Sequence, residues 1–311
     1  MSWNLNHGWG KLVAESLKSK ARTGKVLVVC PTTHGNWEEL NEILPANDKI
    51  RVVTTLQAAA DLCTASEDDV IFLVDGHSET VTAAAGLSFT KAGVSIVGLG
   101  KGDRRPTINF TTATTADLDV DGEGISFENL IFDLTGVDAL AGPLDINADN
   151  ALFKDCEFIT ANASGQAVVG LVTAVGVDGL TLDNCFARGS KDAGNTSFVR
   201  LIGGERHSFK NSTFDGAYRV AAGAIEATSV ASSFKIENCN IRNKTAASTA
   251  VVNVIRNSTA IIAGCVFGIL SGSTPVQIEY QAGGFVGGGG NLLMGRNYYK
   301  AGTTPIAGTL L

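Results

Sequence analysis

A pattern of apolar and polar positions returns at nearly regular intervals along the middle of the chain. In each copy an apolar anchor stands two places before an Asn, Asp or Gly, and a second apolar residue follows three places later. Six copies are ISFENLIF (125–132), ALFKDCEF (151–158), LTLDNCFA (180–187), HSFKNSTF (207–214), FKIENCNI (234–241) and AIIAGCVF (260–267). The anchors, at intervals of 26, 29, 27, 27 and 26 residues, are Phe127, Phe153, Leu182, Phe209, Ile236 and Ile262. An earlier copy, VSIVGLGK (94–101), has Ile96 as its anchor.

Self-similarity with a period of roughly 20–50 residues is typical of solenoids. Short β-rich runs such as AVVGLVTAV and SFVRLI lie between the copies, separated by Gly, Asn and Ser. The i, i+3, i+4 apolar stripes of helical or leucine-rich repeats are absent from this region of the sequence. The pattern therefore predicts an all-β protein: a right-handed parallel β-helix solenoid of about seven coils of ~27 residues, stacked about 4.8 Å apart.

Stacked coils place like side chains in columns. The anchors predict one interior column, and a second is predicted at Phe132, Phe158, Ala187, Phe214, Ile241 and Phe267, with Lys101 at this place in the earliest copy. Asn and Gly tolerate the left-handed backbone of a sharp bend. A corner is therefore predicted at Gly98, Asn129, Asp155, Asn184, Asn211, Asn238 and Gly264.

A column of small residues follows the corner and includes Cys156, Cys185, Cys239 and Cys265. We interpret these cysteines as small buried residues of the core. Metal binding is the alternative interpretation, although no C-x₂-C pair or nearby His accompanies any of them.

The two ends of the chain depart from the repeat. Residues 1–50 predict a small α/β segment, in which GWGKLVAESLKSKA and GNWEELNEIL are helices and KVLVVC is a strand. TTLQAAADLCTA predicts a further helix with Thr54 or Thr55 as its N-cap, placed to cover the open end of the solenoid, and DVIFLV predicts the next strand. The expected segments are thus 1–50 for attachment and capping, 51–270 for the β-helix, and an irregular Gly-rich 271–311 for closure or oligomerisation.

The apolar residues of the N-terminal arm have two interpretations. Trp3, Leu5, Trp9 and Leu12 stand in or beside an otherwise polar stretch and are the expected partner-binding residues. A locally folded tail fits the same pattern, because burial of aromatic side chains serves both purposes.

Composition and charge narrow the classes of function. The chain has 311 residues, is 44% hydrophobic, contains 36 Gly and carries a net charge of −7. An acidic balance disfavours a nucleic-acid binder, which needs a basic face. No apolar run approaches the length of a membrane span, and no signal-peptide pattern begins the chain. We therefore expect synthesis in a reducing cytosol, with the six cysteines present as thiols.

The sharpest candidate for a metal site is DLDVDGEGISFE (117–128). It satisfies the EF-hand loop pattern with Asp117, Asp119, Asp121, Gly122 and Glu128. An EF-hand loop joins two helices, however, whereas in this stretch acidic and apolar residues alternate as they do in a strand with one solvent-exposed face. No metal ligand is therefore assigned, and calcium binding remains the alternative.

No catalytic residue or cofactor is assigned from the sequence. The four histidines lack metal-ligand spacing, and for His77, beside Glu79, a hydrogen bond within a loop is favoured over acid–base chemistry. The other three are His7, His34 and His207. A glycosidase would need two carboxylates on one face, and nothing in the sequence marks two among the candidates Asp183, Asp192, Glu205, Asp215 and Glu226.

Residues 51–110 contain T-L-x-A, D-V-I-F-L, G-H-S-E-T-V-T and G-V-S-I-V-G-L-G, and this stretch resembles the opening coils of pectin-lyase-like β-helix proteins. With the preceding GKVLVVCPTTHGNWEELNEILP, it resembles more narrowly a group of β-helical structural proteins of tailed bacteriophages. That resemblance covers most of the chain and is strongest over 24–135. It implies a protein that decorates the capsid or forms fibres on it, and the chain lacks the Asp/Arg/Lys set of the lyases.

The resulting expectation is a non-enzymatic virion protein, a capsid decoration or head-fibre protein anchored by its N-terminal segment. The expected partners are the major capsid protein or other virion proteins, and a homotrimer is expected by analogy with phage spikes. The alternative is a receptor-binding tailspike that binds or cleaves a host-surface polysaccharide.

Overall fold

The structure is a computed structural model of the chain. It describes residues 24–44, 50–161, 165–190, 194–218, 223–244, 250–254, 260–269, 277–280, 292–294 and 298–299.

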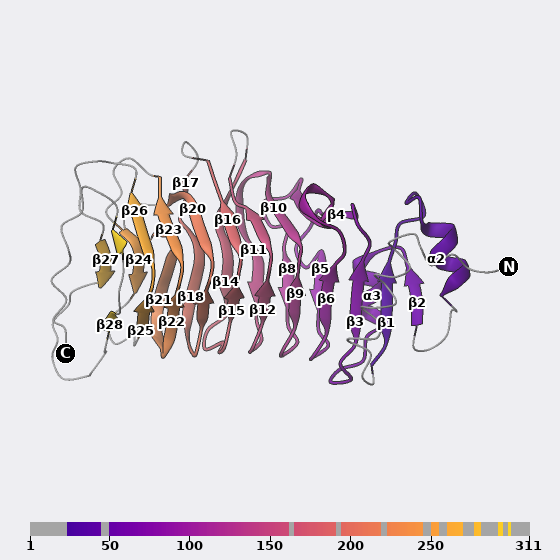
Figure 1. Ribbon diagram of the computed structural model, residues 1–311, viewed down its shortest axis with the longest axis horizontal. Coiled ribbons are helices and arrows are strands. Elements are labelled where there is room, and N and C mark those ends of the chain that lie inside the picture. Colours follow the sequence, from indigo (N-terminus) through magenta and orange to yellow (C-terminus); the bar gives the residue numbers. More distant parts are fainter. Residues whose placement is uncertain are drawn as a thin grey trace.

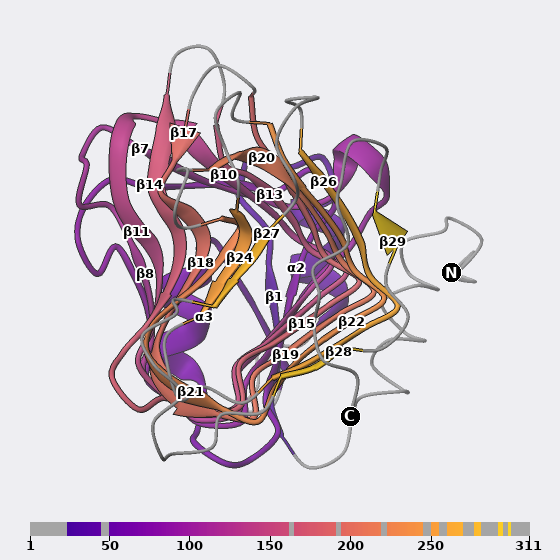
Figure 2. The same ribbon diagram turned by 90° about the vertical axis from the view of Figure 1, so that its left-hand side faces the viewer.

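Three parallel sheets, here called A, B and C, wrap around one core and form an elongated stack of coils (Figures 1 and 2). The eleven strands of sheet A are, in spatial order, β2 (Ile50–Val53), β1 (Val26–Val29), β3 (Val70–Leu73), β6 (Ser95–Gly98), β9 (Ser126–Glu128), β12 (Leu152–Lys154), β15 (Thr181–Asp183), β19 (Ser208–Lys210), β22 (Phe234–Glu237), β25 (Ala260–Ala263) and β28 (Leu292–Met294).

Sheet B contains β4 (Ser78–Val81), β7 (Thr107–Thr111), β10 (Ile131–Gly136), β13 (Glu157–Ile159), β16 (Phe186–Arg188), β20 (Thr213–Tyr218), β23 (Asn240–Asn243), β26 (Val266–Ile269) and β29 (Tyr298–Tyr299), with β17 (Gly194–Asn195) beside β20. Sheet C contains β5 (Leu87–Phe89), β8 (Leu118–Val120), β11 (Asp138–Ile146), β14 (Gln166–Thr173), β18 (Ser197–Glu205), β21 (Ile225–Ser232), β24 (Ala250–Val254) and β27 (Gln277–Tyr280). The eight strands of sheet C correspond to eight coils, close to the seven predicted.

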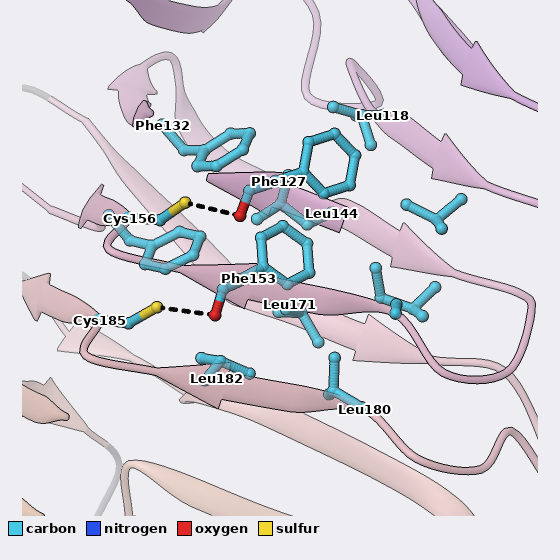
Figure 3. Packing of buried hydrophobic residues seen from close by; sticks show 14 of the residues in the cluster. Leu118, Phe127, Phe132, Leu144, Phe153, Cys156, Leu171, Leu180, Leu182 and Cys185 are labelled. Atoms are coloured by element: carbon cyan, nitrogen blue, oxygen red, sulfur yellow. Dashed lines mark hydrogen bonds between the residues drawn. The ribbon is translucent and has the colours of Figure 1, made fainter. Parts of the chain in front are cut away.

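The anchors of the repeat form one continuous interior column, as predicted. Strand register pairs Phe127 with Phe153, Phe153 with Leu182, and Leu182 with Phe209. Ile236 and Ile262 continue the column. The rings of Phe127 and Phe153 stack with centroids 4.9 Å apart and planes 14° from parallel (Figure 3). The repeat therefore exists because each coil buries its anchor on the anchor of the coil before.

The second apolar position also forms a column, on sheet B. Register pairs Phe132 with Phe158, and Phe158 with Ala187. The earliest copy departs from the prediction at Lys101, which is exposed. There the chain makes a short 3₁₀ turn (η1, Gly102–Arg104) before β7, and Ile108 takes the place opposite Phe132.

The corner between sheets A and B is built as the Asn/Asp/Gly column predicts. The backbone φ angle is +59° at Asn129, +54° at Asn211 and +66° at Gly264, all in the left-handed region. Side-chain amides also connect neighbouring coils, because Asn184 Nδ2 donates to Asp155 Oδ1 at 2.5 Å. Gly98 is the exception, since it lies inside β6 and its φ is not positive.

The cysteine column packs in the core, in agreement with the interpretation from sequence. All six cysteines are free and buried. Cys156 Sγ donates to the carbonyl oxygen of Phe127 at 3.5 Å, and Cys185 Sγ donates to that of Phe153 at 3.3 Å (Figure 3). A hydrogen bond with the Cys156 thiol, together with burial, raises the pKa of Cys185, which keeps it a protonated donor.

Charges alternate in sign along the outer face of sheet A. Register places Glu128, Lys154, Asp183, Lys210 and Glu237 side by side on five consecutive strands. Ion pairs join Lys154 to Glu128 at 3.2 Å and Lys210 to Asp183 at 3.3 Å. Alternation avoids the repulsion that a column of like charges would create between adjacent strands.

Helices pack on both sides of the N-terminal strands, and these strands belong to sheet A. The order β1, α2 (Trp37–Ile43), β2, α3 (Leu56–Leu62), β3 places β1 between β2 and β3. α3 buries Leu56, Ala59 and Ala60 on the interior core, and Thr55 is its N-cap, accepting a hydrogen bond from Ala58 N at 3.2 Å. α2 packs its Leu40 on the outer side of the same strands. Sheet A thus runs through the expected boundary at residue 50, and β27, β28 and β29 carry the three sheets past residue 270.

Candidate functional site

An acidic cluster lies on the outer face of sheet C, near the N-terminal end of the stack. Leu118 and Val120 of β8 point into the core, so the alternating Asp117, Asp119 and Asp121 face outward. Register places Asp145 of β11 directly beside Asp119. Adjacent parallel strands lie about 4.8 Å apart, so the two side chains share one column. We call Asp117, Asp119, Asp121 and Asp145 the sheet C cluster.

Few groups compensate these charges. Asp117 accepts a hydrogen bond from Ala85 N. Asp121 accepts from Asn147 Nδ2 at 3.0 Å and from Ser88 Oγ at 3.4 Å. Within the described part of the chain, no Lys, Arg or His forms an ion pair with any member of the cluster. The described residues therefore supply the cluster with neutral hydrogen-bond donors but with no ion-pairing cation.

This environment shifts the pKa values of three members upward. Burial and the charges of Asp117, Asp121 and Asp145 raise the pKa of Asp119 from 3.8 to about 6. Burial and the nearby Asp117 and Asp121 also raise the pKa of Asp145. Burial raises the pKa of Asp117, against the opposing hydrogen bond from Ala85. Both causes disfavour the charged form.

The shift at Asp119 predicts a pH-dependent stability. A carboxyl whose folded pKa lies above its unfolded value stabilises the fold while protonated, and that contribution is lost as pH rises from about 4 to 6. Asp119→Asn is therefore expected to raise the free energy of unfolding by about 1 kcal/mol at neutral pH, after allowance for solvent screening at this partly exposed position. The gain should vanish below pH of about 4, in urea titrations across pH.

Asp103→Asn is the matched control for that measurement. Asp103 is exposed in η1, outside the sheet C cluster, and its neutralisation should leave the pH profile unchanged. A pH-independent effect of Asp119→Asn would contradict the assigned repulsion.

The EF-hand pattern does not fold into one loop. Asp117, Asp119 and Asp121 lie on or beside β8 of sheet C, whereas Glu128 ends β9 of sheet A and pairs with Lys154. The twelve residues are thus divided between two sheets. In the described ranges, no group of three or more His, Cys, Asp or Glu side chains has an arrangement that could hold a metal ion.

The five carboxylates considered for glycoside hydrolysis do not share one face. Asp183 lies on sheet A beside Lys210, Asp215 on sheet B beside Arg242, and Glu226 on sheet C beside Arg200. Glu205 ends β18 next to Arg206, and Asp192 lies outside the described residues. Each described candidate has a cation from its own or a neighbouring coil.

The described histidines have structural partners. His77 Nε2 lies 3.0 Å from Glu79 Oε2, and the same oxygen accepts a hydrogen bond from Leu56 N at 2.8 Å. The pair therefore holds the first turn of α3. His34 Nε2 contacts the carbonyl oxygen of Asp75 at 3.0 Å. His207 is buried against Gly203 O at 3.0 Å, and burial lowers its pKa. His7 lies outside the described residues.

The expected partner-binding residues Trp3, Leu5, Trp9 and Leu12 also lie outside the described residues. Among the helices that the structure describes, none has the length and apolarity needed to cross a membrane.

Asp117, Asp119 and Asp121 form part of a calcium-binding pattern in the sequence, but that pattern does not include Asp145. A usable signal was present, because Asp119 and Asp145 are 26 residues apart, one period of the repeat. The β11 strand lacks the repeated phrase that identified the corner, so its register had to come from the structure.

Comparisons with known proteins identify solved structures that have a similar fold. No protein-family model and no curated protein sequence matches the chain. A pectin methylesterase from Aspergillus niger, in deglycosylated form, is 16% identical, with a TM-score of 0.50 over 92% of this chain and 88% of its own.

Two further solved structures are similar. A pectin methylesterase mutant in complex with a hexasaccharide is 13% identical, with a TM-score of 0.47 over 80% of this chain and 81% of its own. Pectate lyase Pel9A is 9% identical, with a TM-score of 0.43 over 91% of this chain and 79% of its own. Identity this low shows no shared activity. What the chain has in common with the Aspergillus niger pectin methylesterase is the right-handed parallel β-helix fold.

Proposed function

We propose that the chain is a non-enzymatic structural protein of a tailed-phage virion, a β-helical capsid decoration or head-fibre protein anchored by its N-terminal segment. One observation carries the proposal: outward carboxylates on all three sheets form ion pairs with cations of neighbouring coils. Asp183 binds Lys210, Asp215 binds Arg242 and Lys244, and Glu226 binds Arg200. A surface built this way makes a stiff rod, which is what an appendage requires.

The proposal places the protein on the particle, with the major capsid protein or another virion protein as its partner. Electron microscopy of purified particles labelled with an antibody against the solenoid tests this. Label on the head supports the proposal, and unlabelled particles from a lysate that contains the protein would overturn it.

Deletion of residues 1–20 separates attachment from folding. The shortened chain should keep the strand content and melting temperature of the solenoid but should no longer bind to the particles. If the shortened chain still labels the particles, the anchor lies elsewhere.

A second candidate function, cleavage of a host polysaccharide, is favoured by the sheet C cluster. Asp119 and Asp145 lie on adjacent strands, and the pKa of Asp119 is raised to about 6. Carboxyl groups roughly 5 Å apart, one with a raised pKa, are the minimum that a retaining glycosidase needs. The test is to incubate capsular glycans with the native chain and with Asp119→Asn, and to measure new reducing ends. Reducing ends released by the native chain alone would establish this activity in place of the structural role.

A further inference from the structure

The outer face of sheet B carries a basic strip, although the chain as a whole is acidic. β16 presents Phe186 and Arg188 outward, because the burial of this strand alternates exposed, buried, exposed. Register places Asp215 beside Arg188 and Arg242 beside Asp215 on the next two coils. Lys244 follows β23 on the same coil as Arg242. We call Phe186, Arg188, Arg242 and Lys244 the sheet B strip.

Two carboxylates hold the strip, and each is matched by two cations. Glu157 binds Arg188 Nε at 2.5 Å and also binds Arg105. Asp215 Oδ2 binds Arg242 at 2.5 Å and Lys244 Nζ at 3.1 Å. These four cations surround two anions, and Asp133 of β10 faces outward in the same column two coils before Arg188. With Asp133 included, this group of side chains has a surplus of one positive charge.

Among the described residues, the ion pairs use only part of the donors of each guanidinium group. The ion pair of Arg188 uses Nε, and that of Arg242 uses one terminal nitrogen. Their side chains are 49% and 50% exposed. Phe186, beside Arg188, is 40% exposed and is one of three large hydrophobic side chains exposed among the described residues. Exposed aromatic and Arg side chains are the types enriched where protein interfaces carry their binding energy.

The sheet C cluster has the opposite property. Its four carboxylates have no ion-pair partner in the described part of the chain, and Asp119 and Asp145 repel each other across adjacent strands. A cation brought to this face would relieve that repulsion. The sheet C cluster thus lacks positive counter-charge, and the sheet B strip has positive charge in excess.

We propose that a second copy of this chain binds here, with the sheet B strip of one copy seated on the sheet C cluster of its neighbour. Such a contact is heterologous, since each copy uses two different faces. The cluster lies on the coils of β8 and β11, and the strip lies on the coils of β16, β20 and β23. Neighbours that point the same way are therefore staggered by three to four coils, roughly 17 Å along the stack.

The stagger decides what kind of assembly forms. A closed threefold ring needs both contacting patches at the same height along the stack. With a stagger, each added copy is shifted along the stack relative to the one before, so the assembly does not close and can grow by further copies. The inference departs here from the homotrimer expected by analogy with phage spikes. It does not depend on the virion role, because the contact requires only these two faces.

Charge reversal on each face tests the contact. Light scattering and sedimentation of the full chain should show a mass that grows with concentration at an ionic strength of about 0.03 M and falls toward the monomer at about 0.5 M, because salt screens exposed charges. Arg188→Glu with Arg242→Glu, or Asp119→Arg with Asp145→Arg, should each weaken self-association at least tenfold. An equal mixture of the two variants should associate again, since the reversed faces are complementary.

Two further variants guard against unfolding and nonspecific effects. Asp119→Asn with Asp145→Asn neutralises two of the four carboxylates of the cluster and relieves the repulsion between them. This variant should therefore associate more weakly and be no less stable than the native chain. Lys235→Glu reverses an exposed charge on sheet A and should leave association unchanged. Three results would overturn the proposal. The native chain could stay monomeric at low salt, or the charge reversals could leave association unchanged. The sheet B strip could also bind acidic glycans on an array and show no binding to a second copy of the chain.

Discussion

Replacing Phe153 by Ala is expected to lower the free energy of unfolding by about 3–5 kcal/mol, the usual cost of removing a buried Phe ring. Phe153 is fully buried, stacks on Phe127 at 4.9 Å and meets Phe132 and Phe158 edge-on, each at 5.8 Å. Phe127 on one side and Leu182 on the other are held by their own strands and cannot collapse into the space. Urea denaturation followed by circular dichroism measures the loss.

Phe186→Ala is the matched control for this substitution. Phe186 belongs to the coil that follows but faces outward from sheet B and is 40% exposed. Its removal should change the free energy of unfolding by less than about 1 kcal/mol. Equal losses at the two positions would mean that Phe153 does not belong to a packed interior column.

Asn211→Leu is expected to lower the free energy of unfolding by about 2–3 kcal/mol. The whole loss comes from the corner, because the Asn211 side chain is not part of the core. Asn211 has a φ of +54°, a region in which a Leu side chain clashes with its own backbone. Its Nδ2 donates to Asp183 Oδ1 at 3.0 Å, and its Oδ1 accepts from Asn238 Nδ2 at 3.4 Å. Leu loses both bonds and adds the strain. Thermal and urea unfolding measure the sum.

Asn211→Gly separates the two contributions. Gly accepts the positive φ without strain but lacks the amide, so it should be less stable than Asn and more stable than Leu. A Leu variant as stable as the native chain would show that the corner imposes no left-handed conformation at this position.

The difference between the two substitutions reflects how the solenoid is held. Phe153 acts through dispersion and burial within one continuous core, whereas Asn211 acts through a backbone conformation and bonds between neighbouring coils. Both effects recur along the stack, because similar residue types occupy corresponding places in most coils. The chain therefore builds a rod from many equal contributions, which fits the structural role proposed above.

Much of the fold was predictable because a repeat leaves its register in the sequence. Like residues one period apart must lie one above another, so the column of Phe127 and Phe153 and the bend at Asn211 follow from counting alone. The helix over 56–62 was also predictable, because Thr55 and the apolar spacing after it are local signals. Local and periodic signals need no knowledge of distant contacts.

The sites were harder to predict, because the residues that face outward do not repeat. The sequence by itself determined the stacked coils, the interior columns and the left-handed corner, since burial forces those positions to keep their character in every coil. Only the tertiary structure decided that Asp119 meets Asp145, that Arg188 and Arg242 share a face, and that β1 lies between β2 and β3. Those neighbours are set by how the coils close and which strands pair, and no single stretch of chain contains that information.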